Sequence, residues 1–120
     1  MLPDYQISQE DNIVVIVLNQ NISFQTMCDI WDTILTCRTR QKRLWDLTRY
    51  TGSFSQDELI EFAKYANDSL AEKSYSAMVA STDLLYGVMR QHQVFRQRDR
   101  NTTVNVFRDI RDAKKWLTEV

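Results

Sequence analysis

The chain is poor in the residues that interrupt regular structure, with only two glycines and one proline among 120 residues. This scarcity excludes collagen-like, linker-rich and low-complexity proteins. The longest apolar run, Ile13–Leu18, is far too short to cross a bilayer, which takes about 20 apolar residues. The amino-terminal residues lack the basic and apolar regions of a signal peptide. We therefore expect a cytoplasmic protein without a transmembrane segment.

Side chains that carry catalytic or metal chemistry are also scarce. The chain has one histidine, His92, and two cysteines, Cys28 and Cys37. Nine positions apart in a predicted helix, the cysteines would lie on opposite faces, so they neither form a disulfide nor share a metal. The sequence contains no metal-ligand cluster, nucleophile elbow, phosphate-binding loop or dinucleotide fingerprint. We predict a protein that is not an enzyme and has no cofactor or metal, in which His92 is a packed or surface residue.

Positive charge is missing from the first 37 residues and gathers toward the other end of the chain. Residues 90–115 contain eight lysines and arginines against three aspartates. Such a segment suits an anionic partner or a solvated surface. The aromatic residues there, Phe95 and Phe107, are expected in the core, so we do not predict a nucleic-acid partner.

The amino-terminal region predicts a β-hairpin. Tyr5, Ile7 and Gln9 alternate with polar neighbours, as in an edge strand, and Ile13–Leu18 suits a strand buried on both faces. Asp11-Asn12 between the two strands is a turn signal.

The rest of the chain predicts alternating helices and strands. Helices are expected after Ser23, Ser55 and Asp109 and around Gly87, and the strands between them are 44–47, 74–80 and 103–107. Ser55–Glu58 has the pattern of a capping box. The order β-β-α-β-α-β-α-β-α predicts one α/β domain over residues 1–120. Its small mixed sheet is opened by the antiparallel hairpin, is otherwise mostly parallel, and has helices packed on it.

Three segments, "RLWDLTRYTGSFSQDEL", "AMVASTDLLYGVMR" and "VNVFRDIRDAKKWL", together resemble the SpoIIAA-like proteins of the STAS superfamily, in a bacterial branch also likened to the CRAL-TRIO lipid carriers. The family fold, a small mixed sheet with helices, agrees with the predicted order. The resemblance implies a non-enzymatic regulatory module that binds a protein partner or a small ligand. The alternative is a carrier of a small apolar or amphipathic, lipid-like molecule. A carrier needs an enclosed apolar cavity, whereas a protein-binding module needs an exposed apolar patch.

The resemblance also raises the question of whether a serine of this chain is phosphorylated. In the sporulation antagonists of this family, a serine in an Asp-Ser-Ser/Thr-Gly motif is phosphorylated at the start of the helix after the third strand. The corresponding loop here, "TRYTGSFSQ", lacks the Asp-Ser pair. Ser53 and Ser55 lie at about the right place, but Ser55 is already accounted for as a helix cap, which disfavours a phospho-switch.

Candidate binding residues gather in "STDLLYGVMR". Gly87 costs about 1 kcal/mol in a helix relative to alanine, and it shares a face with Asp83, Tyr86 and Arg90. The glycine allows either close helix packing or the approach of a ligand or partner. In the second case Tyr86 supplies a flat wall and Arg90 contacts an anionic or amphipathic ligand.

Two further predictions concern the surroundings of that helix. Leu84, Leu85, Val88 and Phe95 are expected to hold it on the sheet. Asp46, at the carboxyl end of a strand and at the same sheet edge as Asp83, is either a ligand-binding acid or a carboxylate that fixes its loop. The partner is thus a protein or a small ligand, and the sequence also leaves a homodimer open.

Overall fold

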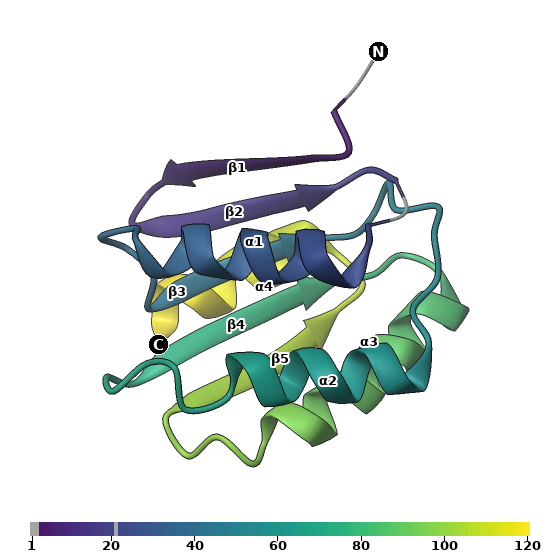
Figure 1. The fold of residues 1–120 in the computed structure, drawn as a ribbon. Helices are drawn as coiled ribbons and strands as arrows, with labels where there is room; N and C mark the ends of the chain where they lie inside the picture. The colour runs from purple at the N-terminus through teal and green to yellow at the C-terminus, as the bar shows by residue number, and fades with distance from the viewer. Residues whose placement is uncertain (1–2, 21) are drawn as a thin grey trace.

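The computed structural model describes residues 3–20 and 22–120, and its elements follow the predicted order (Figure 1). The strands are β1 (Tyr5–Glu10), β2 (Ile13–Leu18), β3 (Lys42–Asp46), β4 (Ser74–Val79) and β5 (Thr102–Phe107). The helices are α1 (Phe24–Leu35), α2 (Gln56–Ala66), α3 (Asp83–Arg96) and α4 (Ile110–Glu119).

The strands lie in the sheet in the same order as in the chain, β1-β2-β3-β4-β5 (Figure 1). β1 and β2 pair antiparallel, and the other neighbours are parallel. Between β1 and β2, Asp11 and Asn12 have φ values of 53° and 64°, the left-handed conformation that the tightest hairpin turns require. The predicted fold class, a mixed sheet opened by an antiparallel hairpin, is therefore confirmed.

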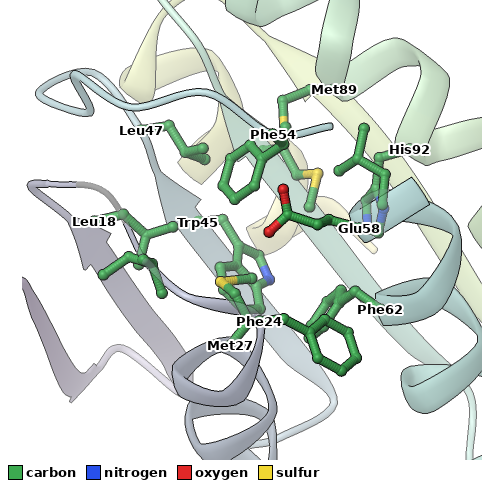
Figure 2. Close-up of a pocket in the computed structure, with 13 residues that line it drawn as sticks. Leu18, Phe24, Met27, Trp45, Leu47, Phe54, Glu58, Phe62, Met89 and His92 are labelled. Carbon is green, nitrogen blue, oxygen red and sulfur yellow. The ribbon is translucent and has the colours of Figure 1, made fainter. Parts of the chain in front are cut away.

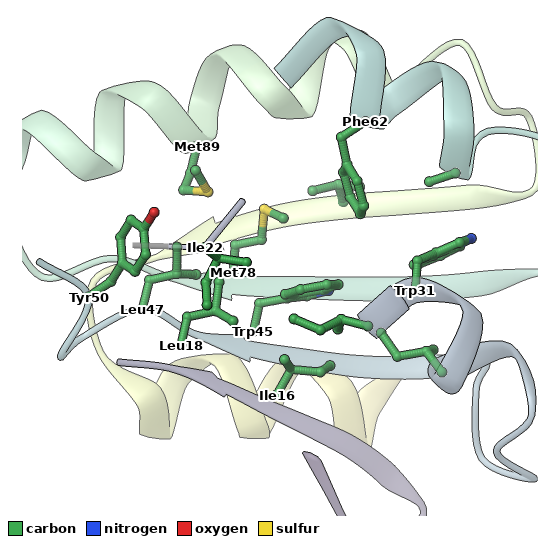
Figure 3. Close-up of a cluster of buried hydrophobic side chains, with 14 of the residues drawn as sticks. Ile16, Leu18, Ile22, Trp31, Trp45, Leu47, Tyr50, Phe62, Met78 and Met89 are labelled. Atoms are coloured by element: carbon green, nitrogen blue, oxygen red, sulfur yellow. The ribbon is translucent and has the colours of Figure 1, made fainter. Parts of the chain in front are cut away.

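Helices cover both faces of the sheet. The larger hydrophobic core lies beneath α1, α2 and α3 and contains the aromatic side chains Trp31, Trp45 and Phe62 (Figure 3). α4 covers the other face, where Ala113 and Leu117 pack with side chains of β2, β3 and β4. This arrangement explains why β2 is apolar along its length, since its side chains enter both cores alternately.

The predicted helix caps fix where the helices begin. Ser23 and Asp109 cap α1 and α4 with their side chains. Ser55 Oγ accepts a hydrogen bond from the backbone N–H of Glu58 (3.1 Å), and Ser55 N–H donates to Glu58 Oε1 (3.2 Å), which is the predicted capping box. Ser55 therefore anchors the start of α2 at the carboxyl edge of the sheet.

Several element boundaries differ from those predicted, and two of these differences change where a side chain lies. β3 begins at Lys42 rather than at Leu44, so Arg43 is part of a central strand and is fully buried. α1 ends at Leu35, and Cys37 lies in the turn that follows rather than in the helix. Both cysteines are buried free thiols. In the described part of the chain, no helix has the length and apolar character needed to span a membrane.

A candidate binding pocket at the carboxyl edge of the sheet

An apolar pocket lies between the sheet and the first turns of α1 and α2 (Figure 2). Three strands and three helices contribute to its wall. Its volume is about 480 Å³ when the space at the open mouth is included, of which about 30 Å³ admits the centre of a water molecule. The lining residues are Leu18, Ile22, Phe24, Met27, Trp45, Leu47, Phe54, Glu58, Leu59, Phe62, Met78, Met89 and His92.

The wall combines rigid rings with adaptable thioethers. Phe62 packs edge-on against Trp45, with 6.3 Å between the ring centroids, and Trp45 is buried. Phe24, by contrast, is 37% exposed, so it lies at the mouth. Met27 and Met89 have unbranched side chains that adjust to differently shaped groups. Met27 is half-buried, so of these two methionines it is the one that can adjust at the mouth.

His92 is the buried polar side chain of this wall. It is only 2% exposed, and its Nδ1 atom has no hydrogen-bond partner in the described structure. Burial, helped by the positive charge of Arg96, lowers the pKa of His92 to about 3. The imidazole is therefore neutral at physiological pH. A buried polar atom without a partner costs free energy, which a ligand group that bonds to it would recover.

Glu58 is the other polar residue of the wall. Figure 2 shows its carboxylate beside the side chain of Phe54. One of its oxygens is already occupied by the capping box with Ser55. No hydrogen bond joins Glu58 to His92 among the described residues. The pocket thus presents an apolar wall with one acid and one neutral imidazole.

None of the five predicted binding residues lines this pocket. Asp46 lies on the other side of β3, because its neighbours Trp45 and Leu47 face the pocket and side chains alternate along a strand. Asp46 Oδ1 accepts hydrogen bonds from the backbone N–H (2.9 Å) and the hydroxyl (2.6 Å) of Thr48. Of the two interpretations of Asp46, these bonds favour the carboxylate that fixes its loop.

Asp83 and Tyr86 form a small surface cluster with Arg108. The guanidinium of Arg108 pairs with Asp83 at 2.5 Å and lies over the ring of Tyr86, 4.3 Å from its centroid. Tyr86 does present a flat wall, but Arg108 of the same chain occupies it. Arg90 is exposed beyond this cluster.

Gly87 does not pack against the sheet. Among residues 3–20 and 22–120, a Cβ atom placed on it would meet no atom within 4 Å outside its own helix and chain neighbours, so close packing there does not explain the glycine. Leu84 was expected to hold α3 on the sheet, but this is wrong, because its side chain is 79% exposed. α3 is held instead by its buried residues Leu85, Met89, His92 and Arg96.

A second polar cluster is buried at the opposite, amino edge of the parallel strands. Asp99 is 2% exposed, and one of its oxygens lies 3.5 Å from the guanidinium of Arg96, which is 3% exposed. Burial raises the pKa of Asp99, but hydrogen bonds from Asn101, Asp68 and Thr102 and the charge of Arg96 outweigh it, so the pKa lies below its ordinary value. Asp99 is therefore ionised at neutral pH.

Arg43 completes this cluster. Its guanidinium donates to Arg40 O (2.7 Å) and Ser74 Oγ (3.3 Å) and lies over the ring of Trp31, 5.0 Å from the centroid. Burial, together with the charge of Arg96, lowers the pKa of Arg43 to about 9. Arg43 stays charged at neutral pH, so this cluster holds two cations and one carboxylate. The hydrogen bonds within it point to a structural role.

The sequence did contain a signal for His92 and Arg96. Leu85, Met89, His92 and Arg96 recur at spacings of four, three and four, which places them on one face of a helix. The apolar character of Leu85 and Met89 marks that face as the inner one. In contrast, the charge of the basic segment 90–115 predicts a surface, although the structure buries Arg96 within it.

Comparisons with known proteins add no family assignment. No protein-family model matches the chain, and no curated protein sequence is significantly similar to it.

Proposed function

We propose that this protein is a non-enzymatic, STAS-like regulatory module that binds a protein partner through the pocket, which receives an apolar side chain of that partner. The observation that carries the proposal is the apolar pocket wall containing the unpartnered Nδ1 atom of buried His92. A polar group that the partner carries into the pocket would satisfy this atom.

The size of the pocket favours a side chain over an enclosed cargo. A dry protein cavity of about 150 Å³ holds a molecule as small as benzene. The space that admits the centre of a water molecule is about 30 Å³ here, and the mouth is open beside Phe24. The tip of one side chain fits after small movements of Met27, whereas an acyl chain requires the core to open.

The charge at the pocket favours an uncharged or basic partner segment over an anionic ligand. Glu58 lies in the wall, and Asp57 is exposed in the same first turn of α2. An anionic headgroup placed here would meet these carboxylates. Because Glu58 is held by the capping box and His92 is neutral, both residues are better suited to binding than to proton transfer.

The test uses amino-acid amides as probes of the pocket. N-acetyl-leucine amide and N-acetyl-tryptophan amide are titrated into protein carrying ¹³C-labelled methionine methyl groups. We expect saturable shifts of the Met27, Met78 and Met89 signals. Met27→Trp should fill the pocket mouth and abolish the shifts, whereas Gln25→Trp, an exposed position on the same helix, should not. Shifts that fail to saturate, or that persist equally in Met27→Trp, overturn the proposal.

Native mass spectrometry of the purified protein addresses the carrier alternative. A small molecule that remains bound through purification would favour the carrier of an apolar or amphipathic molecule. A measured mass equal to that of the chain alone, together with saturable binding of the amides, supports the partner-binding module.

A further inference from the structure

The outward face of α3 carries no charged side chain at its centre. Leu84 is 79% exposed and Val94 is 60% exposed, and Gly87 and Gln91 are exposed between them. Their spacings of three, four and three residues place all four on one stripe along the helix. We call Leu84, Gly87, Gln91 and Val94 the α3 stripe.

This stripe is unusual for the solvent side of a surface helix, which is ordinarily charged or polar. The neighbouring helix α2 shows the ordinary pattern, with Asp57, Glu61 and Lys64 at equivalent spacing on its exposed side. Packing among the described residues does not explain Gly87, because a Cβ atom there would meet open space. The glycine and the two apolar side chains therefore suit a contact made outside the chain.

We propose that the α3 stripe is the contact between two copies of this chain, which pack their α3 helices antiparallel about a two-fold axis at the level of Met89. Leu84 and Val94 each lie five residues from Met89, in opposite directions. Gly87 and Gln91 each lie two residues from it. The axis therefore places Leu84 opposite Val94 of the second copy, and Gly87 opposite Gln91 of the second copy.

This register is complementary in shape. The apolar pair Leu84 and Val94 occurs twice, once at each end of the contact, as a two-fold interface requires. The missing side chain at Gly87 leaves room for the longer Gln91 of the second copy, so the two backbones can approach closely. The Gly87–Gln91 pair thus occurs twice, once on each side of the two-fold axis.

The charges at the ends of the helix are complementary in the same register. Asp83, at the start of α3, has a side chain that is 91% exposed, and Arg98 is exposed just beyond the other end. An antiparallel pair brings Asp83 of one copy within about one turn of Arg98 of the second copy. The carboxylate keeps its contact with Arg108 on its other side.

The position of Arg90 gives a separate test of where the two-fold axis lies. It lies on the same flank as Asp83, one residue from the level of Met89, so the two copies of Arg90 face each other near the axis. Each Arg90 therefore faces the Arg90 of the second copy near the axis. The second copy's Asp83 lies farther from the axis along the helix. Repulsion at the axis weakens the dimer, so Arg90→Gln is expected to tighten it.

A contact between two single helices buries less than the roughly 1,200 Å² of ordinary stable complexes, so the dimer is expected to be weak and concentration-dependent. Its surface faces away from the pocket, which α3 lines with its inner residues Met89 and His92. The two proposals are therefore independent, and each can fail alone.

Sedimentation equilibrium at concentrations up to roughly 500 µM tests the dimer directly. The average mass of the unmodified protein should rise toward that of a dimer. Val94→Arg puts two charges into the apolar contact and should weaken association at least about tenfold. Thr118→Arg, which adds the same charge to the exposed surface of α4, should leave association unchanged. A protein that stays monomeric, or that associates equally as Val94→Arg, overturns the proposal.

Cysteine crosslinking tests the register. Mixing Leu84→Cys protein with Val94→Cys protein under mild oxidation should give a covalent dimer. Leu84→Cys protein alone should give little, because its two thiols would lie about 15 Å apart along the axis. Equal crosslinking of Leu84→Cys alone refutes the antiparallel register.

Discussion

Acidification from pH 7 to pH 5 should destabilise the folded protein through His92. The folded chain holds this imidazole neutral, with a pKa lowered to about 3 by burial and by the charge of Arg96. In the unfolded chain the pKa returns to its ordinary 6.5. Between these two values the unfolded chain binds a proton that the folded chain does not, so stability falls as the pH falls.

The magnitude follows from the same two values. Full stability is present above about pH 6.5, and below it each pH unit removes about 1.4 kcal/mol until the folded pKa is reached. From pH 7 to pH 5 the loss is about 2 kcal/mol, and it is nearly the same for any folded pKa below about 4. Because His92 is the only histidine and carboxylates titrate mainly below about pH 5, this interval isolates its contribution.

Urea unfolding monitored by tryptophan fluorescence at pH 7 and pH 5 measures this loss. The His92→Gln variant cannot take up a proton in this range. Its free energy of unfolding should therefore change much less between pH 7 and pH 5, whatever its value at pH 7. An unfolding free energy that is the same at both pH values in the unmodified protein would refute the reasoning. A His92 pKa near 6.5 in the folded protein, measured by NMR, would do the same.

Three other substitutions test the packing described above. Gly87→Ala should raise the free energy of unfolding of the monomer by up to about 1 kcal/mol, because the added methyl group meets open space; a loss in dilute thermal melts would show unseen crowding. Ser55→Ala should lower it by about 1 kcal/mol through loss of the α2 cap, and unchanged denaturant titrations would remove that role from the serine. Asp99→Asn should cost about 3 kcal/mol, because Arg43 and Arg96 lose their carboxylate. Equal urea midpoints for Asp99→Asn and the unmodified protein would contradict the buried charge cluster.

The order of the elements was predictable because local signals agreed along the chain. The turn at Asp11-Asn12, the cap at Ser55 and the both-face burial of Ile13–Leu18 depend on near neighbours in sequence, and each is confirmed. The strict alternation of strands and helices after the hairpin then left a parallel sheet as the consistent topology.

Burial of charge was not predictable in this way. Arg43 follows a run of polar residues, and a charged side chain is exposed in most proteins. Its partner Ser74 is 31 positions away in the chain, and the ring of Trp31 comes from helix α1. A related point concerns the predicted site residues: Asp83, Gly87 and Arg90 share an exposed region, whereas the pocket is formed on the inner side of α3. Helical spacing gave the faces of α3, and only the packing of the whole chain shows which face is enclosed.

The buried position of Arg43 has a consequence for the order of folding. A sheet whose strands follow chain order could add one strand at a time as the chain is synthesised. Arg43 donates to Ser74 at the start of β4, whose hydroxyl bonds with Thr102 at the start of β5, and Thr102 donates to Asp99. Until β5 docks, a guanidinium in the central strand has no carboxylate connected to it. Partly assembled sheets are therefore penalised, so we expect the five strands to unfold together rather than one at a time.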